Sequence, residues 1–178
     1  NLTRYWFFML FFIGNMQLIV LSDNFLQLFF GWEGVGLCSY GLIGFWNKDK
    51  EEHMVGSPNH KALGLLQSYL PSHAGMKALV TTRIGDIAFL IGLLLLYAYA
   101  GTFSFIELAE NASWAKEMAA VGLLIPSALF IFGGAIGKSA QFPLHVWLPD
   151  AMAGPTSVSA LIHAATMVKA GVFLVARV

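Results

Sequence analysis

The chain has 178 residues, of which 57% are hydrophobic and 11% are charged, and its ten basic and ten acidic residues give a formal net charge of zero. Soluble domains usually carry about 25% charged residues, and nucleic-acid-binding domains carry a basic surface. The composition therefore excludes an ordinary soluble enzyme and a nucleic-acid partner, and it indicates an integral membrane protein.

Five apolar stretches follow one another along the chain, and most have the length of about 17–25 residues that a membrane-spanning helix needs. They lie at residues 5–21, 24–46, 75–99, 118–151 and 155–178. They lack the period-two alternation of barrel strands. We therefore predict an all-α polytopic membrane protein with five transmembrane helices. Residues 47–72 are polar and are expected to form a solvated loop, and Lys77 just beyond them is expected to snorkel to the membrane surface.

The ends of the chain indicate that it is a fragment of a longer polytopic protein. It begins at Asn1 without a methionine and stops at Val178 inside an apolar run. We therefore expect further membrane-spanning segments outside this sequence.

The fourth stretch is too long for one straight helix, and Pro143 and Pro149 interrupt it. Proline removes a backbone donor and clashes with the preceding helical turn. We expect a broken helix whose first half ends near Ser139, followed by a non-helical link around residues 141–143 and a short second half. Such a break at membrane depth persists only where protein or a water-filled cavity surrounds it.

Glu33 is the main candidate for chemistry, because it lies near the middle of the second stretch. A charge at the bilayer centre costs a few kcal/mol or more, so it usually faces a partner, water or a functional path. Gly36, three residues on, shares its helix face and allows a neighbouring helix to approach. The alternative is a protonated carboxyl group that only bonds to a partner helix.

Lys138 is the second candidate, because it lies beside the expected break. A buried lysine near a carboxylate can take up and release protons, but it can also snorkel or bind the free carbonyls of a broken helix. Arg83 and Asp86 form an i,i+3 pair on one face of the third stretch, where a structural and a functional ion pair are equally compatible with the spacing.

Histidine and a further lysine provide relay candidates near the end of the chain. His163 and Lys169 lie in the fifth stretch, and His145 lies beside the break. An imidazole titrates near neutral pH and can pass protons, although a lone buried histidine is often only hydrogen-bonded. The single cysteine, Cys38, excludes a cysteine-ligated iron–sulfur cluster held by this chain alone. No metal-binding motif occurs, so we assign the chain no cofactor and no metal.

Several segments resemble the antiporter-like membrane subunits of proton-pumping respiratory complex I, of the chain 5 or L type. These segments are WEGVGLCSY at 32–40, TRIGD at 82–86, GKSAQFPLH at 137–145 and SALIHAATM at 159–167. The resemblance covers nearly the whole chain except residues 47–72. The length of that loop, together with Lys169, suggests an archaeal or Mrp-like relative.

The resemblance implies a fold and a set of roles. The family builds its core from two inverted five-helix repeats, and this chain is similar to most of the first. Glu33 and Lys138 would form a coupled pair that tunes the proton affinity of the lysine. His163 would pass protons onward, and Arg83, Asp86, His145 and Lys169 would support the path.

The resemblance also implies partners and leaves alternatives open. The chain would be a non-redox, proton-translocating subunit of a complex I-like oxidoreductase in a lipid bilayer, most simply the prokaryotic plasma membrane rather than the mitochondrial inner membrane. Flavin, iron–sulfur clusters and quinone would belong to partner subunits of the membrane arm and beyond. The alternatives are a sodium/proton antiporter subunit without redox input and a structural subunit with vestigial charges.

Overall fold

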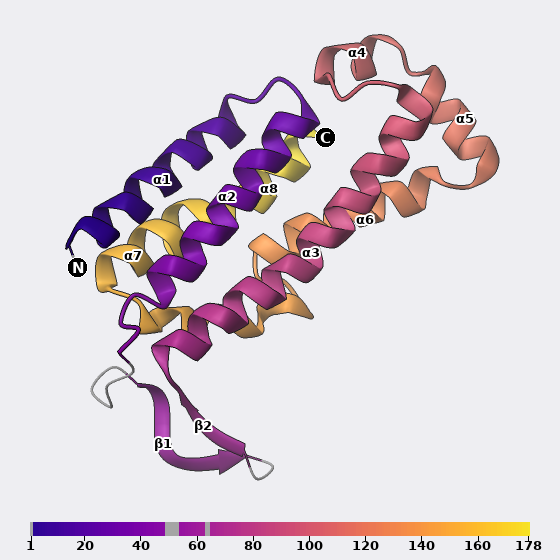
Figure 1. Cartoon of the computed structure of the whole chain (residues 1–178). Coiled ribbons are helices and arrows are strands. Elements are labelled where there is room, and N and C mark those ends of the chain that lie inside the picture. The colour runs from indigo at the N-terminus through magenta and orange to yellow at the C-terminus, as the bar shows by residue number, and fades with distance from the viewer. Residues whose placement is uncertain (1, 49–53, 63–64) are drawn as a thin grey trace.

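The structure is a computed structural model that describes residues 2–48, 54–62 and 65–178. Within these ranges, only the backbone is described for residues 55, 57–62, 65–69, 163 and 164. Helices of different length lie side by side, a two-stranded hairpin projects from one end of the bundle, and two short helices cover the other end (Figure 1). The N-terminus lies toward the hairpin end and the C-terminus toward the opposite end.

The first two helices form an antiparallel pair. α1 spans Leu2–Val20 and α2 spans Phe25–Ile43. The N-cap of α2 is Asn24, whose Oδ1 accepts a hydrogen bond from the backbone N–H of Gln27 at 2.8 Å. This contact satisfies one of the free N–H groups at the start of the helix.

A β-hairpin stands where the sequence predicted only a solvated loop. β1 (Val55–Ala62) pairs antiparallel with β2 (Leu65–Tyr69), in a register that joins Val55 to Tyr69 and Ala62 to Leu65. Antiparallel strands joined by a short connection satisfy each other's backbone groups. The all-helical prediction therefore holds for the bundle and not for this appendage, and residues 49–53 of the predicted loop lie outside the described residues.

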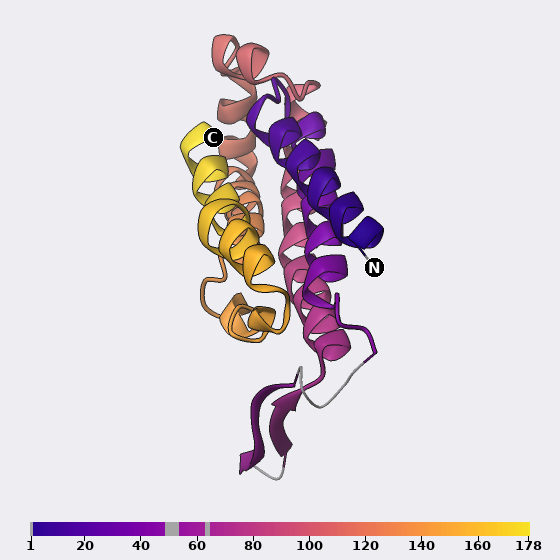
Figure 2. The ribbon, with the colours of Figure 1, turned by 90° about the vertical axis from the view of Figure 1, so that its left-hand side faces the viewer.

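The central element is α3, which spans Pro71–Ala100 and is 30 residues long. Proline at its first position suits a helix start, and the backbone N–H of Gly101, in the left-handed region at φ 71°, bonds to the Tyr97 carbonyl at its end. α3 packs against α2 on one side and against α6 on the other. The view turned by 90° shows α1 and α2 on one side of α3 and the C-terminal helices on the other (Figure 2).

The next segment bends sharply at a position that the sequence analysis missed. α4 (Phe105–Glu110) and α5 (Ser113–Val121) lie at one end of the bundle, and α6 (Leu124–Lys138) runs back into it at 105° to α5. Gly122 permits this bend, because its φ of 78° is readily adopted only by glycine. Residues 118–121 therefore belong to α5, not to the helix that ends at Lys138.

Beyond α6 the chain adopts short turns before it becomes helical again. Phe142–Pro143 is a cis peptide bond, and two 3-10 turns follow at η2 (Leu144–Trp147) and η3 (Asp150–Ala153). The second half of the predicted broken helix is thus not an α-helix. The last helix begins as α7 (Thr156–Val158), widens to the π-helical η4 (Ser159–Thr166) and ends as α8 (Met167–Arg177).

The described residues contain two helices that are long and apolar enough to cross a membrane, namely α3 and the helix at Thr156–Arg177, or three if the bent α5–α6 pair is one span. The predicted count of five spans is therefore matched only in part by these criteria. Large apolar side chains of α1 and α3 are exposed on the outside of the bundle, as expected for a surface that faces lipid.

Candidate functional site

Three helices bring charged side chains together inside the bundle. α2 carries Glu33, α3 carries Arg83 and Asp86, and α6 ends at Lys138. Because α3 packs against both α2 and α6, its charged residues can reach partners on either side. The structure thus assembles four of the residues that the sequence singled out.

The most buried contact of this group is the ion pair between Lys138 and Asp86. The Lys138 Nζ lies 3.1 Å from Asp86 Oδ2, and the two side chains are 1% and 2% exposed. Removing such charges from water costs several kcal/mol per ion, so both need good partners. Trp32 supplies the other partner, because its indole Nε1 donates a hydrogen bond to Asp86 Oδ1 at 2.7 Å.

The second ion pair lies nearer the surface of the bundle and joins Glu33 to Arg83. Their side chains are 24% and 44% exposed, so this pair is far less desolvated than the first. The charges of Asp86 and Lys138 also act on Glu33. The two pairs therefore form one electrostatic unit that extends from a buried lysine to a half-buried carboxylate.

This pairing differs from the pairing that the sequence analysis expected. Among the described residues, Arg83 and Asp86 are not bonded to each other, and Glu33 and Lys138 are each paired with a residue of α3. Positions three apart on a helix point in directions about 60° apart, so they can address different neighbours. An exposed pair within one helix is worth only about 0.2–0.5 kcal/mol, whereas the buried ammonium of Lys138 needs a carboxylate.

Gly36 provides the space that the Lys138 ammonium occupies. A Cβ atom added at Gly36 would lie 2.6 Å from the Lys138 Nζ and 3.9 Å from Asp86 Oδ2. The sequence analysis placed Gly36 on the face of Glu33 and expected it to admit a neighbouring helix. The structure gives it a more specific role, because the object it admits is the charged end of Lys138.

Small residues hold α6 against α3 and so place Lys138 beside Asp86. A Cβ atom at Gly85 would lie 2.8 Å from the Gly133 carbonyl oxygen and 2.9 Å from Gly137 Cα. Further along, the Ser127 hydroxyl donates to the Gly92 carbonyl at 3.1 Å. Close backbone approach through small residues is the usual way that helices associate within membranes.

The break after α6 is stabilised by a tryptophan and not by the lysine. The Trp147 indole Nε1 donates to the Gly137 carbonyl at 3.1 Å, and Trp147 is fully buried. Lys138 therefore neither snorkels nor takes this free carbonyl, which were the open alternatives for it. Sequence analysis missed both Trp32 and Trp147, because an indole N–H gives no signal until its partner is located in space.

Two of the remaining sequence candidates, His145 and Lys169, do not join the charged group. His145 is exposed and stacks on the ring of Phe142 with centroids 5.9 Å apart, and Lys169 is exposed on α8. The backbone at His163 lies within the π-helical segment, while its side chain lies outside the described residues.

A third ion pair joins α3 to the turns beyond the break. The Lys77 Nζ lies 2.5 Å from Asp150 Oδ2, with side chains 29% and 13% exposed. The sequence predicts that Lys77 snorkels to the membrane surface, and the structure adds a carboxylate partner for it, Asp150 on η3. This contact fixes the turns after α6 to the hairpin end of α3.

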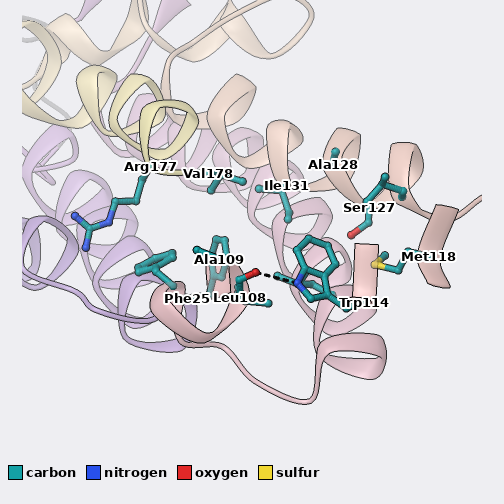
Figure 3. Close-up of a pocket in the computed structure, with 13 residues that line it drawn as sticks. Phe25, Leu108, Ala109, Trp114, Met118, Ser127, Ala128, Ile131, Arg177 and Val178 are labelled. Atoms are coloured by element: carbon teal, nitrogen blue, oxygen red, sulfur yellow. Dashed lines mark hydrogen bonds between the residues drawn. The ribbon is translucent and has the colours of Figure 1, made fainter. Parts of the chain in front are cut away.

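An apolar cavity of about 290 Å³ lies near the α4–α5 end and is separate from the charged group (Figure 3). Phe25, Phe105, Trp114 and Met118 line it together with Arg177. The Arg177 guanidinium lies 4.9 Å from the Phe105 ring centroid and donates to the Ser22 carbonyl at 2.7 Å. No residue of the two inner ion pairs lines this cavity.

No cluster of three or more His, Cys, Asp or Glu side chains suited to a metal ion occurs in the part of the chain that the structure describes. Cys38 is buried and unbonded to another cysteine.

Comparison with protein families gives one match that covers most of the chain. Residues 22–57 and 64–178 match the model of the family described as NADH:quinone oxidoreductase/Mrp antiporter, TM. The matched residues include both inner ion pairs.

Curated relatives are similar over nearly the whole chain but are much longer. The chain is 47% identical to the NADH-quinone oxidoreductase subunit L of Escherichia coli K12 over 175 residues, which are 98% of this chain and 25% of that protein. It is 50% identical to the same subunit of Campylobacter jejuni, over 93% of the chain and 24% of the relative. The chain is 47% identical to the chloroplastic NAD(P)H-quinone oxidoreductase subunit 5 of Carpenteria californica, over 98% of this chain and 21% of that protein.

The chain therefore spans about a quarter of the length of these relatives. Among solved structures, a chain of the membrane-bound sulfane sulfur reductase, an archaeal respiratory membrane complex, superposes with a TM-score of 0.71. That match covers 95% of this chain and 30% of the other at 23% identity, so it supports the fold alone.

Proposed function

Since the chain belongs to the NADH:quinone oxidoreductase/Mrp antiporter family of membrane subunits, we propose that it is part of a proton-translocating subunit of a complex I-like respiratory oxidoreductase. In this proposal, electron transfer to a quinone or an analogue takes place in other subunits and drives proton movement here. The observation that carries the proposal is the buried Lys138–Asp86 pair at the end of the interrupted helix.

The proposed proton carrier is Lys138. Burial disfavours a charged ammonium, whereas the adjacent Asp86 carboxylate favours it. When Asp86 holds the lysine, the ammonium form is stable. When the carboxylate moves away or is neutralised, the buried ammonium loses its partner and gives up its proton to the next acceptor.

Glu33 and Arg83 provide the element that biases this switch. Arg83 and Asp86 lie on neighbouring turns of α3. Glu33 interacts electrostatically with both Asp86 and Lys138. If Glu33 leaves Arg83, the freed guanidinium attracts Asp86, its i,i+3 neighbour. The family resemblance implies that Glu33 and Lys138 are coupled. In this proposal, Arg83 and Asp86 on α3 transmit the coupling between them. His163, His145 and Lys169 are proposed to carry protons to and from this group.

The proposed architecture is one antiporter-like membrane domain that includes residues 1–178 and continues in a longer chain. α1 and α2 each have 19 residues and are thus about 28 Å long at 1.5 Å per residue, close to the thickness of a hydrocarbon core of about 30 Å. They would join α3, α6 and the Thr156–Arg177 helix to give five spans.

Partners and location follow from the same assignment. The chain is an integral membrane protein, and we place it in a prokaryotic plasma membrane beside other membrane-arm subunits. The flavin, the iron–sulfur clusters and the quinone would lie in partner subunits, so this subunit would be non-redox and without independent catalytic activity.

A second candidate function is an Mrp-type sodium/proton antiporter subunit, because the family description covers both classes. The two differ in their energy source. Purification of the complete complex separates them, since subunits with flavin and iron–sulfur clusters support the oxidoreductase and a set of small antiporter subunits supports the exchanger.

The test of the proposed function is Lys138→Met in the intact complex, with the exposed Lys116→Met on α5 as the matched control. Membrane vesicles are assayed for electron transfer to quinone and for proton uptake driven by it. We expect Lys138→Met to lose most proton uptake and Lys116→Met to keep it. Full pumping in Lys138→Met would overturn the proposal and favour a structural subunit with vestigial charges.

A further inference from the structure

Trp32 makes a polar contact that packing alone does not require. Its side chain is fully buried, and its indole Nε1 donates to Asp86 Oδ1 at 2.7 Å. The indole ring also packs edge to face on Phe89, with centroids 5.4 Å apart. The ring is therefore held in place by a neighbour on α3, and its single polar atom is aimed at the carboxylate.

The indole contact fixes which oxygen of Asp86 faces the lysine. An indole N–H is a donor only, so an oxygen that faces it must offer a lone pair. Asp86 Oδ1 faces Trp32, whereas Oδ2 faces the Lys138 Nζ at 3.1 Å. A proton exchanged directly between the lysine and the carboxylate therefore passes through Oδ2, the oxygen that faces the ammonium.

The same tryptophan also contacts the lysine. The Lys138 Nζ lies 5.9 Å from the Trp32 ring centroid, within the range of a cation–π interaction. One side chain of α2 thus touches both members of a pair formed by α3 and α6. Glu33 is the next residue of α2, so a movement of this helix that changes the Glu33–Arg83 contact also displaces the indole.

We propose that Trp32 is the positioning residue of the Lys138–Asp86 pair: its N–H fixes the carboxylate with Oδ2 toward the lysine, and its backbone links this geometry to the state of Glu33. This inference rests on the proposed function and adds to it the residue that couples the two ion pairs. The competing explanation is that Trp32 is only a core aromatic residue.

Trp32→Phe separates these explanations, because it keeps an aromatic ring and removes the donor. The variant is made in the full complex, and pumping per electron and the pH profile of coupled turnover are measured in vesicles. The content of assembled complex is measured first. If Trp32→Phe fails to assemble, the benzothiophene analogue of tryptophan is incorporated at position 32, since it keeps the shape and lacks the N–H.

For a positioning role we expect Trp32→Phe to lower coupled turnover about tenfold, the change typical of losing one hydrogen bond to a charged group. The pH profile of coupled turnover should also differ from that of the wild type, because the donor that holds Asp86 Oδ1 is absent.

Other charged or titratable groups on the helices and turns around the pair must be considered when the pH profile is read. They are Glu33, Cys38 and Tyr40 on α2, His73, Lys77, Arg83, Tyr97 and Tyr99 on α3, His145 on η2, Asp150 on η3, Lys169 and Arg177 on α8, and His163, whose side chain is not described. Trp32→Phe leaves every one of these groups in place, so a shift that it causes is assigned to the pair whose hydrogen bond it removes.

The outcomes distinguish this inference from the proposed function. If Lys138→Met abolishes pumping but the donor-free variant at position 32 pumps normally with an unchanged pH profile, Trp32 is only a packing residue. A loss of coupled turnover with an unchanged pH profile leads to the same conclusion. If Lys138→Met itself pumps normally, the proposed function fails first.

Discussion

The end of the Lys138 side chain occupies the space that any side chain at Gly36 would need. A Cβ atom at Gly36 would lie 2.6 Å from the Lys138 Nζ. Because Nζ is the far end of a flexible side chain, the lysine can move, but it then leaves its 3.1 Å contact with Asp86. A residue without a side chain is thus part of the geometry of the ion pair.

Gly36→Ala is expected to uncouple the complex without unfolding it. The added methyl group displaces the ammonium by about 1 Å and weakens the pair, so proton uptake per electron should fall severalfold while the content of assembled complex stays normal. Gly14→Ala on α1 is the control, because nothing lies within 4 Å of a Cβ added there. Normal pumping in Gly36→Ala would show that the lysine tolerates displacement.

Gly85→Ala, unlike Gly36→Ala, is expected to lower the stability of the complex. Here a Cβ atom would meet the backbone of Gly133 and Gly137 at 2.8 and 2.9 Å, and backbone cannot move aside as a lysine tip can. Overpacking typically costs about 1–3 kcal/mol. We expect a lower amount of assembled complex and a lower midpoint of thermal inactivation, again with Gly14→Ala as control. A variant with normal stability would contradict the close approach of α3 and α6.

These positions also show how far the sequence could be interpreted. Apolar runs and prolines were sufficient to expect a helical bundle with an interruption near Ser139, and α6 ends at Lys138. Intramembrane charge was sufficient to select Glu33, Lys138, Arg83 and Asp86, because such charges are rare.

Other features depended on information that one-dimensional patterns lack. The bend at Gly122 and the hairpin at 55–69 arise from local backbone geometry within stretches that appeared uniform. Which carboxylate meets which base depends on helix rotation. Glu33 and Lys138, predicted to pair with each other, therefore each pair with a residue of α3. The indole donors of Trp32 and Trp147 were missed because tryptophan in an apolar helix normally indicates only packing.

The contact between Lys77 and Asp150 predicts a role in holding the turns beyond α6. Asp150→Asn removes one charge of a partly exposed pair, for which a loss of about 0.2–1 kcal/mol is typical. The variant should assemble and pump but inactivate at a temperature a few degrees lower. Lys77→Asp alone places two carboxylates together, so its inactivation temperature should be lower than that of Asp150→Asn. The exchanged variant Lys77→Asp/Asp150→Lys should recover part of the lost inactivation temperature. No recovery in the exchanged variant would indicate that the pair contributes no stability.

The two inner ion pairs should respond very differently to the loss of one carboxylate. Asp86→Asn leaves the ammonium of Lys138 buried at 1% exposure without its partner, and an unpaired buried charge costs about 3–5 kcal/mol. Glu33→Gln leaves Arg83 44% exposed and open to its surroundings, so the cost should not exceed about 1 kcal/mol. Both variants should lose pumping, but only Asp86→Asn should also lose assembled complex.

Removal of both buried charges tests the cause of that difference. Asp86→Asn/Lys138→Met contains no uncompensated charge, so the content of assembled complex and the thermal midpoint should return toward wild type, while proton uptake stays lost. If the double variant is as unstable as Asp86→Asn alone, the instability comes from lost hydrogen bonds to Asp86, including that of Trp32, and not from the buried ammonium. Recovery of stability without recovery of pumping is the result expected when the same two charges are costly to bury and necessary for proton transfer.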